Sequence, residues 1–151
     1  MSNNLKAKEG CLCYISLGDS KWIGEILSIS PEGICNLLVF PIYDSYKEAN
    51  DEALKNASLV RSSMSIHIDK IELYNKEYHY PVQLIEGKKN GIKFIDVISD
   101  YCDEVLAHFV LCDKYEEEIK IIAKNMVAQL NKEYRHEKEV EMIKDYLNEQ
   151  T

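Results

Sequence analysis

The fold of this chain is decided by residues 113–150, which read DKYEEEIKIIAKNMVAQLNKEYRHEKEVEMIKDYLNEQ. Apolar side chains recur there in steps of three and four, the period of one face of an α-helix. They lie at Tyr115, Ile119, Ile122, Met126, Leu130, Tyr134, Val140, Ile143 and Leu147. The stretch therefore predicts one long amphipathic helix or a bent pair, and its apolar face needs something to pack against.

A wholly polar run, residues 135–139, interrupts this face. The part before it is rich enough in apolar side chains to pack on the rest of the chain. Val140, Ile143 and Leu147 form a short, separate stripe, which we expect to contact a partner. A homodimer through this helix is one such arrangement.

Upstream, the pattern changes to the alternation of β-strands. We expect strands at 11–17, 22–29 and 34–40, joined by short turns into an antiparallel meander. Residues 42–57 show helical spacing among charged side chains and predict a short helix or an excursion. A further strand is expected at 59–68, with a bulge, bend or single helical turn near Asp69-Lys70 to absorb a change of phase.

A hairpin follows, because residues 80–85 and 92–95 flank Asn90-Gly91, a dipeptide typical of two-residue turns. After it the apolar positions step by three and four, at Ile95, Ile98, Cys102, Val105, Leu106, Phe109 and Val110. This spacing predicts a helix over 96–111.

The expected class is α+β, with an antiparallel small barrel or roll followed by two C-terminal helices. We expect a mobile lead at 1–9, one α+β core domain at 10–112, and a helix at 113–151 that packs on the core or on a second copy. Gly10, Tyr14, Trp22, Gly24 and Ile26 resemble the first strands of SH3-like or Tudor-like barrels. The resemblance covers about a fifth of the chain and implies a small barrel, with no implied function.

The net charge of −8 on 151 residues disfavours binding to nucleic-acid phosphates or to anionic membranes. The polar first ten residues lack the apolar core of a signal peptide, and no apolar run is long enough to span a membrane. Five cysteines without a secretion signal indicate free thiols in a reducing compartment. We expect a cytoplasmic protein, and the composition resembles that of AT-rich bacterial or phage genomes.

Acidic residues gather between Phe94 and Asp113, a segment without lysine or arginine. A patch of one sign steers partners of the opposite sign. The expected partner-binding residues are therefore Asp96, Asp100, Asp103 and Glu104, together with Val140, Ile143 and Leu147. The expected partner is a basic protein.

Two alternatives remain open. Tyrosine supplies much contact area at low entropic cost, so a small molecule or nucleotide would bind at Trp22, Tyr74, Tyr78, His79 and Tyr80. An enzyme would need a cleft that gathers His67, His79 and Cys102. Cys11 and Cys13 lack the second ligand pair of a structural zinc site, so no metal or cofactor is expected.

The favoured hypothesis is a non-enzymatic, acidic binding protein. Small inhibitors of bacterial or phage origin, including immunity and anti-defence proteins, have this general composition.

Overall fold

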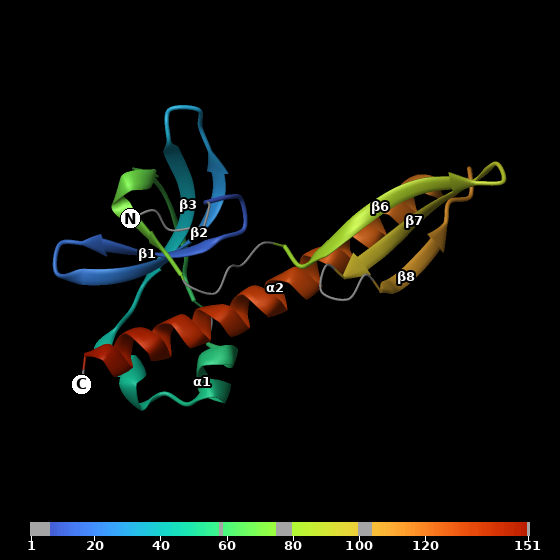
Figure 1. Cartoon of the computed structure of the whole chain (residues 1–151). Coiled ribbons are helices and arrows are strands. Elements are labelled where there is room, and N and C mark those ends of the chain that lie inside the picture. Colours follow the sequence, from blue (N-terminus) through green and yellow to red (C-terminus); the bar gives the residue numbers. More distant parts are fainter. Residues whose placement is uncertain (1–6, 58, 75–79, 100–103, 151) are drawn as a thin grey trace. The chain divides into compact units, whose positions relative to one another are not determined.

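The computed structural model describes residues 7–57, 59–74, 80–99 and 104–150, and it forms two compact units (Figure 1). The first unit consists of residues 1–79 with 136–151, and the second of residues 80–135. In these described residues, eight strands in two antiparallel sheets and a long C-terminal helix confirm the α+β class. The structure divides the chain differently from the single core expected over 10–112.

The first unit begins with the expected meander of β1 (Leu12–Leu17), β2 (Ser20–Ile29) and β3 (Ile34–Pro41). Two further strands, β4 (Ser62–His67) and β5 (Ile71–Leu73), pair with β3 and β1. The sheet order is therefore β4-β3-β2-β1-β5. A single 3-10 turn, η2 (Ile68–Lys70), absorbs the change of phase that the sequence indicated near Asp69-Lys70.

The core of this sheet contains side chains from all five strands. Cys13, Ile15, Ile26, Leu37 and Val39 are buried together, and residues of the two edge strands, such as Met64 and Leu73, pack on them. The sheet therefore curls around its core. In the described segments no pairing joins β4 to β5, so the sheet is open and the expected closed barrel is not established.

Between β3 and β4 the chain forms the short helical excursion that the sequence predicts, with η1 (Asp44–Glu48) and α1 (Asp51–Asn56). Asn50 caps α1, because its side-chain oxygen accepts a hydrogen bond from the Ala53 amide at 2.7 Å. Leu54 is buried, and its carbonyl lies 3.2 Å from Nε2 of His136. These contacts fix the excursion on the C-terminal helix.

The second unit holds β6 (Val82–Lys89), β7 (Ile92–Ser99) and β8 (Val105–Val110), in that order. The hairpin turn at Asn90-Gly91 is confirmed. Its two residues have φ of 54° and 81°, the left-handed conformation that two-residue hairpin turns require.

The helix predicted over 96–111 is wrong, because β7 runs on to Ser99 and β8 pairs with it. Ile95 and Val97 alternate as buried residues against the helix side of the sheet, while Phe94 and Asp96 lie on the other side. The apolar residues of β7 and of β8 each follow the alternation of a strand. The steps of three and four appear only when both strands and the residues between them are taken as one continuous element. Within the described residues, the C-terminal part of the chain therefore contains one helix rather than the two expected.

That helix, α2 (Glu116–Glu149), is unbroken and contributes to both units. In the second unit, Ile119, Ala123, Met126 and Leu130 pack on the sheet. The buried face of the helix differs in part from the apolar face expected from the sequence. Tyr115 is 51% and Ile122 54% exposed, while Ala123 is fully buried. The polar run at 135–139 coincides with the boundary between the units and does not break the helix.

In the first unit, the apolar side chains of the last turns of α2 are buried within the single chain. Val140, Ile143 and Leu147 are each less than a tenth exposed, as is the neighbouring Met142. The free apolar stripe expected here is therefore not present in the single chain, because these side chains are already covered. No helix in the described residues is long and apolar enough to cross a membrane.

Candidate functional site

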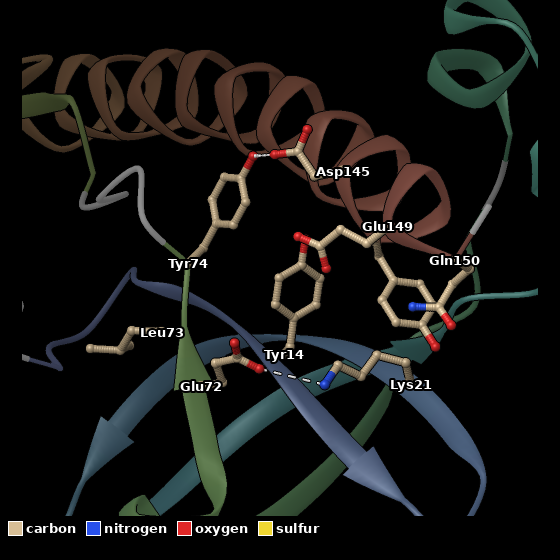
Figure 2. A pocket seen from close by; sticks show the side chains of 9 residues that line it. Tyr14, Lys21, Glu72, Leu73, Tyr74, Asp145, Glu149 and Gln150 are labelled. Carbon is tan, nitrogen blue, oxygen red and sulfur yellow. Dashed lines mark hydrogen bonds and ion pairs between the residues drawn. The ribbon is translucent and has the colours of Figure 1, made fainter.

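A hollow of about 330 Å³ in the first unit lies between the sheet and the last turns of α2 (Figure 2). Its walls carry three tyrosine rings, three carboxylates and one ammonium group. These belong to Tyr14, Tyr74 and Tyr146, to Glu72, Asp145 and Glu149, and to Lys21. We refer to this site as the tyrosine–carboxylate hollow.

The pairing of the strands places the side chains that the sheet contributes to the hollow. Along β1, Cys13 and Ile15 point into the curled core, so Tyr14 points to the opposite face. Glu72 on β5 pairs directly with Tyr14, and Lys21 on β2 pairs with Ser16, two residues further along β1. All three side chains therefore stand on the sheet face turned toward α2.

The helix supplies further side chains, from residues spaced by three and four. Met142, Asp145, Tyr146 and Glu149 lie on one side of the last two turns. Figure 2 shows Glu149 reaching from the helix toward the ring of Tyr14. Because Met142 is buried, the apolar stripe of the helix is what holds this polar side over the sheet.

Two hydrogen bonds fix the tyrosine rings. The hydroxyl of Tyr14 donates to the carbonyl of Met142 at 2.8 Å, and the hydroxyl of Tyr74 donates to the carboxylate of Asp145. The two rings meet edge to face, with centroids 5.9 Å apart at 85°. The hollow is therefore held in shape by contacts between strand and helix.

Burial raises the pKa of both hydroxyls well above the usual value for tyrosine. The nearby charge of Asp145 adds to this shift in Tyr14, and the hydrogen bond to Asp145 adds to it in Tyr74. Both groups consequently remain protonated donors at neutral pH.

Lys21 places a cation inside the hollow. Its ammonium nitrogen lies 5.7 Å from the ring centroid of Tyr14 and 6.0 Å from that of Tyr146. It also lies 3.5 Å from a carboxylate oxygen of Glu72 and 3.3 Å from the hydroxyl of Ser16. The site thus combines aromatic faces and carboxylates around one positive charge, the arrangement that recognises cationic groups.

Of the residues expected to bind a small ligand, the hollow includes only Tyr74 among those the structure describes. Trp22 packs on the core on the other side of the sheet, and Tyr80 lies in the second unit. Tyr78 and His79 lie outside the described residues. That these residues form one ligand site stays a prediction.

The structure describes two of the four acidic residues of the expected patch. Asp96 pairs with His108 across β7 and β8, and Glu104 is exposed just before β8. Asp100 and Asp103 lie outside the described residues. Whether the patch binds a partner stays a prediction.

Of the residues of the enzyme alternative, the structure describes only His67. His67 ends β4 and accepts a hydrogen bond from the Asp69 amide at 3.1 Å, so it caps η2. His79 and Cys102 lie outside the described residues.

The side chains of Cys11, Cys13 and Cys35 are buried in the core of the first unit. Burial raises the pKa of Cys13 to about 12, which opposes formation of a reactive or metal-binding thiolate. Among the residues that can be placed, no group of three histidine, cysteine or acidic side chains could hold a metal ion.

Sequence reasoning missed six of the residues that argue for this site, namely Tyr14, Lys21, Glu72, Asp145, Tyr146 and Glu149. One signal was available, since Asp145 and Glu149 are spaced by four on the side of the helix next to its apolar stripe. The pairing of that side with β1 spans more than a hundred residues and has no local signature.

Comparison with known proteins adds no relative, since no protein-family profile, curated protein or solved structure matches this chain.

Proposed function

We propose that this chain is a non-enzymatic binding protein whose first unit engages a basic macromolecular partner at the tyrosine–carboxylate hollow. The observation that carries the proposal is that three carboxylates, three tyrosine rings and one lysine line the same hollow. A cation over an aromatic face gains about 0.5–2 kcal/mol, more as water is excluded. Hydrogen bonds to carboxylates add to this, so the hollow favours positive side chains over neutral or acidic ones.

The distribution of charge supports the same conclusion. Eight basic and ten acidic residues lie in 80–135, so the first unit carries −6 of the net charge of −8. Such a field raises the rate at which basic partners arrive, and the hollow would then hold them. The lining groups suit binding rather than proton transfer, because the pKa values of Tyr14 and Tyr74 are raised and both hydroxyls already donate hydrogen bonds.

The type of protein that we propose is a cytoplasmic inhibitor of bacterial or phage origin, of the immunity or anti-defence kind, which acts by covering a basic surface. The five-stranded sheet that curls around its core supports the proposed likeness to SH3-like or Tudor-like barrels, while no pairing closes the sheet in the described residues. That likeness concerns architecture, and the partner is argued from the hollow alone.

The test is binding of a fluorescein-labelled Arg-Gly repeat peptide, followed by anisotropy at near-physiological salt. In the double variant Glu72→Gln with Glu149→Gln we expect the Kd to rise about tenfold, which corresponds to about 1.4 kcal/mol. The matched control is Asp44→Asn with Glu48→Gln, which removes the same charge from exposed positions of η1. Equal weakening by both double variants, or no binding by the parent chain, would contradict the proposal.

A small cationic molecule is a second candidate ligand, because about 330 Å³ lies within the range of small-ligand sites. Spermidine and arginine amide, tested for a rise in Tm that Glu72→Gln abolishes, would reveal it.

A further inference from the structure

We propose that Lys21 is a built-in occupant of the tyrosine–carboxylate hollow, and that the partner presents an arginine side chain which takes its place. The inference rests on the proposed function, and it names the chemical group that the site recognises. It also assigns Lys21 a role as an internal competitor that limits affinity.

Lys21 is held weakly by the contacts around it. Its distances of 5.7 Å and 6.0 Å to the ring centroids of Tyr14 and Tyr146 are close to the limit of about 6 Å for a useful cation–π contact. The Lys21 side chain is 22% exposed, but the Glu72 side chain with which it pairs is 70% exposed, and an ion pair with such an exposed partner contributes little to stability. The ammonium group can therefore leave at small cost.

The rest of the hollow does not depend on Lys21. Tyr14 and Tyr74 are anchored to α2 by their hydroxyl groups, through Met142 and Asp145. Asp145 and Glu149 come from the helix, in whose last turns Ile143 and Leu147 are buried. When the flexible stem of Lys21 swings toward solvent, the rings and carboxylates stay in place, and the site is preorganised for another cation.

Arginine fits this site better than a second lysine. Its guanidinium group is planar, stacks on aromatic faces and donates paired hydrogen bonds to a carboxylate. Glu149 reaches toward Tyr14 from the helix, and Glu72 stands on the strand that pairs with Tyr14 (Figure 2). A fork of donors can engage these carboxylates while its face lies on a ring, which the compact ammonium group of Lys21 cannot do.

The first test compares the affinity of Lys21→Gln with that of Lys47→Gln for the labelled Arg-Gly repeat peptide. Lys47 is an exposed residue of η1, so its substitution removes one positive charge without opening the hollow. We expect Lys21→Gln to lower the Kd about tenfold and Lys47→Gln by less than about threefold. A Lys-Gly repeat peptide of equal length should bind more weakly than the Arg-Gly peptide to the parent chain.

The second test observes the displacement in the unmodified protein by NMR. Ring currents of Tyr14 and Tyr146 should shift the ε-methylene protons of Lys21 upfield, and saturation with the Arg-Gly peptide should return them to the position of free lysine. The role of Lys21 is overturned if these protons keep their shift at saturation, or if both lysine variants gain peptide affinity equally. The proposed function still stands in that case, provided that Glu72→Gln with Glu149→Gln weakens peptide binding. If neither the parent chain nor Lys21→Gln binds the peptide, both fail.

Discussion

Glu139 shows how far a single residue can depart from what its sequence context indicates. It lies in the polar run at 135–139, yet its side chain is 2% exposed and pairs with Arg61, whose guanidinium group lies over the ring of Phe40. We expect Glu139→Ala to lower the free energy of unfolding by about 3–5 kcal/mol, because it leaves a charge without its buried partner. The exposed neighbour Glu137 is the control, since Glu137→Ala should change stability by about 0.5 kcal/mol or less in urea denaturation.

The tyrosines of the hollow predict a dependence of stability on alkaline pH. Burial raises the pKa of Tyr14 and Tyr74 in the folded chain above the value of about 10 that tyrosine has when unfolded. Stability from this shift is complete below about pH 10 and is lost as the pH rises through the folded pKa values, because the unfolded chain releases protons first. Thermal melts across this range should show a steeper loss for the parent chain than for Tyr14→Phe, and equal slopes would count against buried, protonated hydroxyls.

At the scale of elements, the sequence predicted those whose signals are local. The meander, the Asn90-Gly91 hairpin and the long helix each follow from period or turn chemistry within a few residues. The error over 96–111 arose because β7 and β8 become strands through pairing with each other, and periodicity alone does not report pairing. The tyrosine–carboxylate hollow could not be predicted, because it requires β1, β5 and α2 to meet.

Isoleucine occurs at a buried and at an exposed position of α2, so one residue type allows the effect of burial on stability to be compared. Ile143 is 1% exposed and Ile122 is 54% exposed, so their truncation should differ sharply. Ile143→Ala should cost about 2–5 kcal/mol in unfolding free energy by cavity formation, and Ile122→Ala less than about 1 kcal/mol. Equal costs in guanidinium denaturation would show that the last turns of α2 do not pack as described.

At the scale of the whole molecule, the chain forms two units that share one helix. Local openings follow cooperative units of structure, so a lesion in one unit should leave the other protected. In Ile143→Ala, amide hydrogen exchange should accelerate in β1 and β2 and stay unchanged in β6 and β7. Val97→Ala, at a buried position of the second unit, should give the reverse pattern. Uniform acceleration in both variants would contradict the division.

We propose that a basic partner binds at the tyrosine–carboxylate hollow, and NMR mapping of the binding surface is the sharpest test of this proposal. Titration of the isotopically labelled full chain with the Arg-Gly repeat peptide should shift the amide signals of Tyr14, Glu72 and Glu149 first and most. Signals of acidic residues of the second unit, such as Asp96 and Glu104, should change little at the same peptide concentration. Shifts confined to residues 85–110, or spread evenly over all exposed acidic residues, would contradict the account.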